Sequence, residues 1–185
     1  MKPLFFCFLI SLFCLSSYSQ QIAPAPADKA VVYFARPALF GFAVEFFYYD
    51  STNFIAKANN INYFRYECKP GSHLFWAKSE NLVFMEANLE AGKIYFIEVK
   101  ASSGIPIADV VLNAVDPGTD EKAVKRILKL MEKKSPVTMT SEVITKENER
   151  VKKIIDDVLE KYRKRKDAGK KIEQLEKNMY YTPGS

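Results

Sequence analysis

Short segments rich in apolar and aromatic residues follow one another from about residue 28 to residue 118, and turn-forming residues separate them. Such punctuation at regular spacing is typical of the strands of a β-sandwich or a small barrel. The predicted strands cover residues 30–35, 42–49, 54–58, 63–67, 73–78, 82–89, 94–100 and 107–115. We therefore predict a mainly β fold, an antiparallel β-sandwich of about seven or eight strands followed by C-terminal amphipathic α-helices.

The segment from Ile94 to Lys100 alternates most clearly between its two sides. Successive side chains of a strand point to opposite faces, so Tyr95, Ile97 and Val99 share one face. We predict that these three residues face the core and that the opposite face is partly exposed to solvent.

The turn at Pro70-Gly71 predicts a local chain reversal. Proline presets φ at the first central position of a turn, and glycine tolerates the positive φ that a type II turn needs at the second. We expect the flanking segments, residues 63–67 and 73–78, to pair as a hairpin.

The chain changes character at Asp116-Pro117-Gly118. Residues 28–118 contain eight basic and ten acidic residues and every phenylalanine of the mature chain, whereas residues 119–185 contain eighteen basic and twelve acidic residues. Apolar residues three and four positions apart behind Thr119 predict a short helix that ends near Ser135-Pro136. A longer stripe follows, at Val151, Ile154, Ile155, Val158, Leu159 and Tyr162, with a continuation at Ile172, Leu175 and Met179. Such stripes must be covered, by the sandwich or by another chain.

The N-terminus has the layout of a secretory signal peptide, with a charge at Lys2, an apolar run from Leu4 to Leu15 and small residues before Ser19. We predict a signal peptide over residues 1–19, an unpacked Ala/Pro leader over 20–27, and a product that is periplasmic or secreted and soluble after cleavage near Ser19. The residues before Cys7 and Cys14 are bulky, which argues against a lipoprotein. The mature chain would keep only Cys68, so its fold must do without an internal disulfide.

Candidate catalytic groups are few. His73 is the only histidine, and no histidine or cysteine partner is near it or near Cys68 in the sequence. Scattered carboxylates such as Glu86 and Glu98 on predicted strands are the remaining candidates for acid-base catalysis. Such catalysis needs two carboxyl groups that face each other in a cleft. We predict no metal, no cofactor and no enzymatic activity.

Two features favour binding instead. Phe46, Phe47, Tyr48 and Tyr49 are consecutive, so aromatic rings lie on both faces of one strand, and Phe47 and Tyr49 are candidate ligand contacts unless a helix docks on them. The cluster Arg163, Lys164, Arg165 and Lys166 is a candidate contact for an anionic envelope surface or a partner, unless it is simply a solvated helix face. Export excludes nucleic acid as a partner.

Three motifs occur in a fixed order. They are Ala30-Val31-Val32-Tyr33-Phe34-Ala35-Arg36-Pro37, then Tyr63-Phe64 with Pro70-Gly71-Ser72-His73, and finally Glu90-Ala91-Gly92-Lys93-Ile94-Tyr95-Phe96-Ile97-Glu98-Val99. In this order they resemble the bacterial family called domain of unknown function 2846, over about residues 28–100. The resemblance implies a small extracytoplasmic β-sandwich, often on a lipoprotein or an exported protein, without an assigned reaction. Arg36, the charged residue of the first motif, is a candidate contact with a ligand or with an acid at the sheet edge.

These observations favour a non-enzymatic binding or assembly protein of the cell envelope, with a protein or envelope partner contacted through the C-terminal helices. The alternatives are a carboxylate-based hydrolase of envelope glycans and a glycan- or peptide-binding module that uses the aromatic strand.

Overall fold

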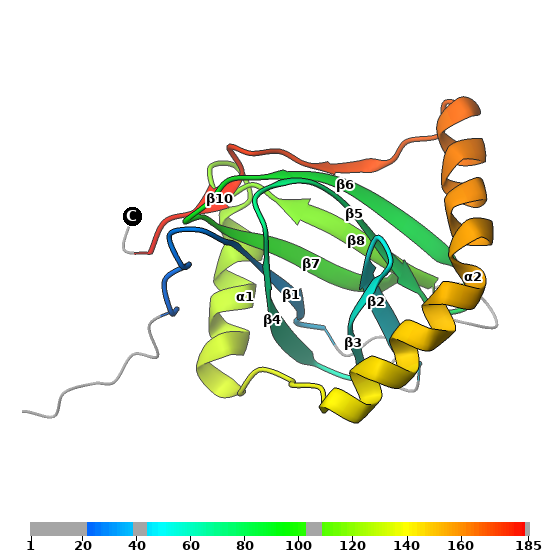
Figure 1. The fold of residues 1–185 in the computed structure, drawn as a ribbon. Helices are drawn as coiled ribbons and strands as arrows, with labels where there is room; N and C mark the ends of the chain where they lie inside the picture. The colour runs from blue at the N-terminus through cyan, green and yellow to red at the C-terminus, as the bar shows by residue number, and fades with distance from the viewer. Residues whose placement is uncertain (1–21, 39–43, 103–108, 184–185) are drawn as a thin grey trace, which may run out of the picture.

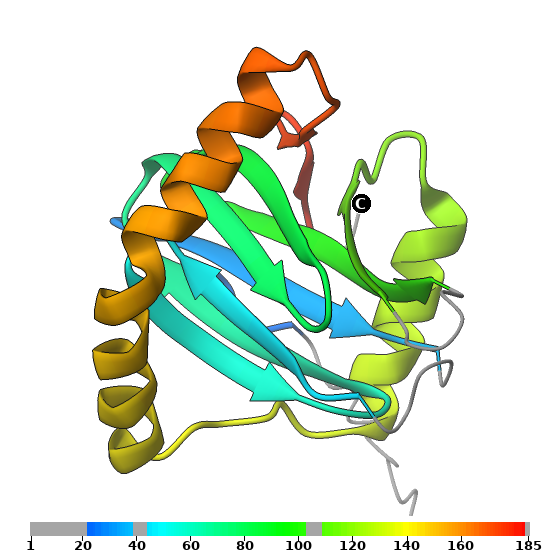
Figure 2. The ribbon, with the colours of Figure 1, turned by 90° about the vertical axis from the view of Figure 1, so that its right-hand side faces the viewer.

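Two β-sheets lie face to face, and one helix covers the outer face of each sheet (Figure 1). The structure is a computed structural model that describes residues 22–38, 44–102 and 109–183. Figure 2 shows the same arrangement from the side of the second helix, which crosses the strands beneath it. The described chain thus forms four layers, helix, sheet, sheet and helix.

Sheet A has the strand order β10-β7-β1-β4, and β8 pairs with the remainder of the β7 edge beyond β10. Its strands are β1 (Ala30–Arg36), β4 (Asn62–Cys68), β7 (Ile94–Ser102), β8 (Asp109–Val115) and β10 (Tyr180–Tyr181). Sheet B has the order β3-β2-β5-β6-β9. Its strands are β2 (Phe46–Asp50), β3 (Asn53–Ala58), β5 (Gly71–Lys78), β6 (Leu82–Leu89) and β9 (Glu173–Leu175).

A strand lies within or across each of the eight predicted segments, so the mainly β, sandwich-like prediction is confirmed. The prediction of a purely antiparallel sandwich is wrong, because β1 pairs in parallel with β7 and β6 pairs in parallel with β9. Between β4 and β7 the chain passes through β5 and β6 of sheet B, and β7 then pairs with β1 on the side opposite β4. Residues 42 and 43 and residues 107 and 108 of the predicted segments lie outside the described residues.

The predicted hairpin at Pro70-Gly71 is also wrong. Gly71 does adopt a positive φ of 118°, but β4 pairs with β1 in sheet A while β5 pairs with β2 and β6 in sheet B. The turn therefore carries the chain from one sheet to the other. Turn residues specify a local change of direction, whereas burial of strand faces selects the pairing partner.

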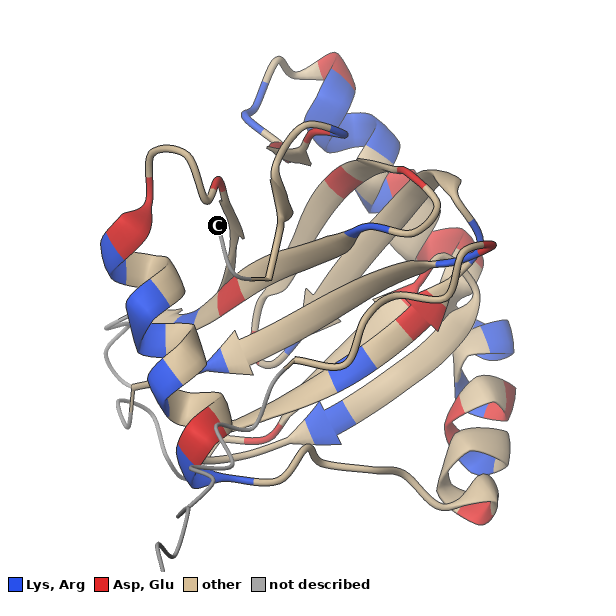
Figure 3. Cartoon of the chain, turned by 90° about the vertical axis from the view of Figure 1, so that its left-hand side faces the viewer, with Lys and Arg blue, Asp and Glu red and all other residues tan. Residues whose placement is uncertain are grey.

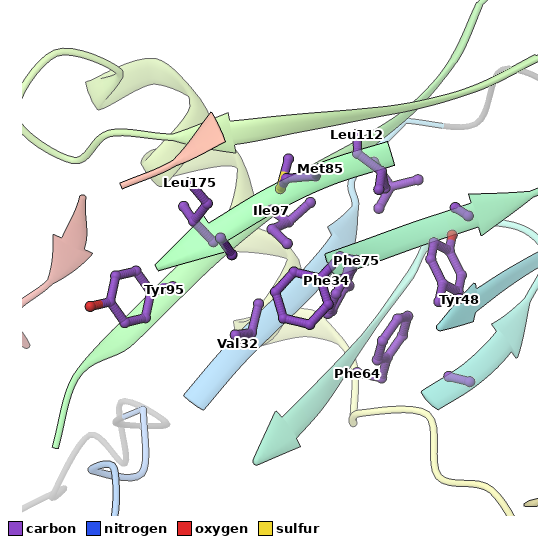
Figure 4. Packing of buried hydrophobic residues seen from close by; sticks show 14 of the residues in the cluster. Val32, Phe34, Tyr48, Phe64, Phe75, Met85, Tyr95, Ile97, Leu112 and Leu175 are labelled. Carbon is purple, nitrogen blue, oxygen red and sulfur yellow. The ribbon is translucent and has the colours of Figure 1, made fainter. Parts of the chain in front are cut away.

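The inner faces of the two sheets form the main core (Figure 4). Tyr95, Ile97 and Val99 are at most 1% exposed and belong to it, so their assignment to the core face is confirmed. The opposite face of β7 is not solvent exposed as expected, because Ile94 and Phe96 pack against α1 (Glu121–Lys133). A helix converts the second face of this strand into a second core.

Helix α1 begins one residue later than expected, with Asp120 as the N-cap residue. It buries an amphipathic stripe against sheet A, made of Ala123, Val124, Ile127, Leu130 and Met131. Helix α2 (Ser141–Asp167) begins after Thr140, whose side chain accepts a hydrogen bond from the backbone N–H of Val143. Its stripe, centred on Val151 and Val158, packs on the outer face of sheet B. Both helical stripes are therefore covered by the sandwich of the same chain.

The chain after α2 does not continue the helix. Gly169 has a φ of 63°, and the following residues form β9 and β10, one added to each sheet. Leu175, expected on a helical stripe, is 1% exposed in the core between the sheets. The region after residue 118 thus supplies both helices and completes both sheets.

The predicted signal peptide and the cleavage position at Ser19 lie outside the described residues. Ile22 and Ala25 of the expected leader are partly buried against the α1 cluster, so they are not unpacked. Within the described ranges, no helix is long and apolar enough to cross a membrane.

Candidate functional site

A groove of about 520 Å³ lies between the first half of α2 and the outer face of sheet B. We call it the α2 groove. Its lining residues come from β2 and the residues just before it, from the β5–β6 turn, and from α2: Val44, Glu45, Phe47, Tyr49, Lys78, Ser79, Glu80, Glu147, Arg150 and Ile154. It contains Phe47 and Tyr49, two of the residues singled out from the sequence.

The aromatic floor of the groove follows from the alternation of β2. Phe46 and Tyr48 point into the core between the sheets, so Phe47 and Tyr49 face α2. Tyr49 is 4% exposed and stacks on Trp76, with 3.8 Å between ring centroids and 13° between ring planes. Phe47 is only half-buried. The aromatic strand is therefore core on one face and, on the other, partly covered by a helix and partly open to the groove.

The helix wall of the groove contains a buried charge. Glu147 is 4% exposed, and Arg150 Nη1 donates to its two carboxylate oxygens at 3.0 and 3.2 Å. Burial raises the pKa of Tyr49 to about 12, and the negative charge of Glu147 adds to this effect. One turn of helix thus places an ion pair directly beside the aromatic floor.

One hydrogen bond ties α2 to the edge of sheet B. The backbone N–H of Phe54 in β3 donates to Asn148 Oδ1 at 2.7 Å. Asn148 is adjacent to Glu147, so this contact fixes the helix at the groove and satisfies a backbone donor of the edge strand.

The basic cluster at the end of α2 is largely engaged with its own chain. Lys164 forms an ion pair with Glu160 at 2.5 Å, and Arg165 donates to the backbone oxygen of Leu82 at 3.2 Å. Lys166 contacts Glu86 at 2.8 Å, and Arg163 is exposed. Figure 3 shows lysines and arginines at this end of α2 and along α1. The cluster lies on the same helix as the groove but is not among the residues that line it.

Glu86 is the anchor of this helix end. Its carboxylate accepts hydrogen bonds from Lys166 Nζ, from the hydroxyl of Tyr162 and from Gln174 Nε2. These donors, led by Lys166, lower its pKa to about 2. Glu86 therefore connects β6, α2 and β9 rather than serving as a proton donor.

Arg36 is buried at the end of β1, with 1% of its surface exposed. Its guanidinium lies 4.2 Å from the centroid of the Phe46 ring and 3.5 Å from the backbone oxygen of Val44. Burial lowers its pKa. Because Phe46 faces the core between the sheets, Arg36 lies on the opposite side of β2 from the α2 groove.

The fold assembles a histidine site that the sequence did not indicate. His73 Nδ1 lies 2.7 Å from Asp50 Oδ2, which also accepts a hydrogen bond from the Tyr66 hydroxyl at 2.9 Å. His73 Nε2 lies 2.8 Å from the backbone oxygen of Lys69. The hydrogen bond to Asp50 and the nearby Cys68 thiol raise the pKa of His73 to about 10.

A histidine with this pKa is protonated at neutral pH and donates both N–H groups, one to a carboxylate and one to a carbonyl. It then has no free lone pair to accept a proton from Cys68, which general-base catalysis requires. Sequence reasoning missed its partner Asp50 because the two residues lie on different strands. The arrangement supports a structural role for His73.

A second cleft, between α1 and the β7–β8 edge, contains a buried carboxylate as well. Glu98 is 3% exposed and accepts hydrogen bonds from Arg126 at 2.8 to 3.0 Å, while Lys100 Nζ lies 3.0 Å away. Two cations neutralise this carboxylate, so it connects β7 with α1. Among the described residues, no group of histidine, cysteine, aspartate and glutamate side chains is suited to hold a metal ion.

The sequence did not single out Glu147, Arg150 or Lys78. One signal was present, since Glu147 lies one helical turn before Val151 and so occupies a position in the apolar stripe of α2. A charged residue within an apolar stripe indicates a buried partner or a cavity.

Comparisons of the sequence with family models and with curated proteins found no relative.

Proposed function

We propose that the protein is a non-enzymatic binding protein of the cell envelope, exported by its N-terminal signal, and that its partner occupies the α2 groove. The observation that carries this proposal is the groove itself, in which a half-buried Phe47, a buried Tyr49 and the buried carboxylate of Glu147 converge. Concave surfaces that combine aromatic side chains with placed polar and charged groups are a common form of binding site. The resemblance to domain of unknown function 2846 supports the extracytoplasmic assignment.

The packing of the helices changes the partner contact that we expected from the sequence. The apolar stripes of α1 and α2 pack on the sheets of their own chain, which leaves mainly charged residues outside. A partner that contacts α2 would therefore meet the groove and the charged helix surface, where Arg163 is exposed, rather than an apolar stripe. The basic end of α2 is suited to weak, salt-dependent contact with an anionic envelope surface.

Co-purification from the native envelope tests the proposal. Phe47→Ala removes the exposed part of the groove floor, and Leu128→Ala removes a similarly half-buried side chain from α1 as a matched control. We expect a partner that the wild-type protein retains to be lost from the Phe47→Ala protein and kept by the Leu128→Ala protein. Equal retention by both variants, or no specific partner of the wild type, contradicts the proposal.

A carboxylate-based glycan hydrolase is the second candidate, because three carboxylates, Glu45, Glu80 and Glu147, line the same groove. Such an enzyme needs one carboxyl group that keeps its proton near neutral pH. Arg150 donates to both carboxylate oxygens of Glu147, so this carboxylate is engaged in an ion pair. Release of reducing sugar from envelope glycans that Glu147→Gln abolishes would establish this candidate in place of the first.

A further inference from the structure

We propose that the α2 groove binds a basic side chain, lysine or arginine, of a polypeptide partner. This inference rests on the proposed function, since it names the chemistry that the groove recognises. Three properties of the groove carry it: a desolvated carboxylate with an exchangeable counter-ion, an aromatic floor, and an open rim.

The desolvated carboxylate is Glu147. It lines the groove and is 4% exposed, so water contributes little to its solvation. A buried carboxylate needs a cation or several hydrogen-bond donors beside it. The groove therefore contains a strong, preformed acceptor for a positively charged group.

The present counter-ion of Glu147 is held loosely. Arg150 lies three residues further along α2, and 63% of its side chain is exposed. An exposed arginine that leaves an ion pair regains its hydration, so its departure costs little. An incoming ammonium or guanidinium group can take its place, and Glu147 stays neutralised throughout.

The aromatic floor favours the same ligand. The face of an aromatic ring attracts cations, and a desolvated ring does so more strongly. The half-buried ring of Phe47 already has the Lys57 ammonium 5.7 Å from its centroid. Phe47 and Glu147 line the same groove, so a cation paired with Glu147 can also contact the exposed part of the Phe47 ring.

The rim indicates that the cation belongs to a larger molecule. Glu45, Lys78, Glu80 and Arg150 line the groove and are all exposed. Small-molecule sites usually bury most of their ligand, whereas the exposed rim of this groove would leave a free amine in contact with water. A side chain on a polypeptide is shielded by the rest of its own chain. Glu80 and Glu147 line the groove beside Phe47, a combination that suits a basic segment, whereas Glu45 already has Lys57 Nζ at 3.5 Å.

The test uses Trp76 as a built-in reporter, because it is the only tryptophan and stacks on Tyr49 beneath the groove. The mature full-length protein is titrated, at constant ionic strength, with N-acetyl-Gly-Arg-Gly-amide, its lysine analogue and its glutamine analogue. We expect a saturable change of tryptophan emission with the two basic peptides only. A response to all three peptides, or to none, overturns the proposal.

Three variants make the assignment specific. Glu147→Gln should weaken binding about 10-fold or more, since the buried charge is gone. Glu149→Gln, on the exposed side of the same helix, should leave it unchanged. Arg150→Ala removes the competing cation and should tighten binding several-fold, an effect that damage to the fold would not produce. Weaker binding by the folded Arg150→Ala protein contradicts the exchange of counter-ions.

Two further experiments separate the remaining explanations. If ethylammonium chloride saturates the tryptophan response at the same concentration as the lysine peptide, the ligand is a free amine and a polypeptide is rejected. Loss of the native partner in Phe47→Ala but not in Glu147→Gln, together with no response to basic peptides, would reject the cation and keep the groove. Retention of the partner by both variants would reject the proposed function as well.

Discussion

Replacing Asp50 with asparagine should remove most of the pH dependence of stability between about pH 6.5 and pH 10. In the folded protein the pKa of His73 is raised from 6.5 to about 10, with the hydrogen bond to Asp50 as the main cause. A raised pKa means that the protonated form is stabilised by folding. The contribution is therefore fully present below the unfolded pKa of 6.5 and is lost as the pH rises through about 10.

The size of the effect follows from the shift. At about 1.4 kcal/mol per pH unit, the full displacement corresponds to at most about 5 kcal/mol. The pair is not sealed from water, since 13% of the His73 side chain and 7% of the Asp50 side chain are exposed. We therefore expect a loss of about 1.5 to 3 kcal/mol in the free energy of unfolding between about pH 7 and pH 9.5.

Two measurements check this prediction. Urea unfolding followed by Trp76 emission gives the free energy of unfolding across the pH range, and NMR follows the imidazole of the single histidine directly. Asp109→Asn, a half-buried carboxylate on β8, is the matched control and should keep the wild-type slope. Equal slopes for wild type and Asp50→Asn, or a His73 titration near pH 6.5, would refute the reasoning.

Three further predictions concern other parts of the fold. The hydrogen bonds to Glu86 lower its pKa to about 2, so their contribution to the stability of the fold is present above pH 4.5 and is lost as the pH falls toward 2. In urea unfolding, Glu86→Gln should remove about 1 kcal/mol of this loss of unfolding free energy at acid pH. The value is small because solvent screens the charge of the lysine partner. Val151 of α2 is fully buried against sheet B, so Val151→Ala should cost about 2 kcal/mol of unfolding free energy, while Lys152→Ala, at an exposed position, should change it by less than about 0.5 kcal/mol. Gly71 has a φ of 118°, and no atom lies within 4 Å of the place that an alanine Cβ would take, so Gly71→Ala should cost about 1 to 3 kcal/mol through backbone strain alone. Thermal unfolding checks this against Gly118→Ala, since Gly118 has no positive φ and its added Cβ would meet only the Asp116 carboxylate, at 3.3 Å. Equal effects within either of the last two pairs, or an unchanged acid profile for Glu86→Gln, would contradict the corresponding explanation.

Part of the candidate site was predictable from the sequence. The run from Phe46 to Tyr49 had to place rings on both faces of a strand, because side chains alternate along any strand. The other half of the groove comes from Glu147 and Arg150, which are about one hundred residues away from that strand in the sequence. Charged residues of an amphipathic helix usually face solvent, so the sequence alone does not show that these two line a groove on the sheet. The same holds for Asp50 and His73, which meet because β2 and β5 are neighbours in sheet B.

The sequence by itself determined the elements of this protein: the segments that form its longer strands, both helices, and the inward face of β7 at Tyr95, Ile97 and Val99. These depend on alternation, helical period and turn residues, which act between near neighbours along the chain. Only the tertiary structure decided which strands pair, that the turn at Gly71 joins two sheets, that β9 and β10 complete those sheets, and that a helix covers the second face of each sheet. Strands β10 and β9 have only two and three residues, too few to show a periodic pattern in the sequence. Strand pairing is selected by the burial of whole sheet faces against segments that are distant in the sequence. The groove belongs to this second group, since a concave surface exists only where separate elements meet.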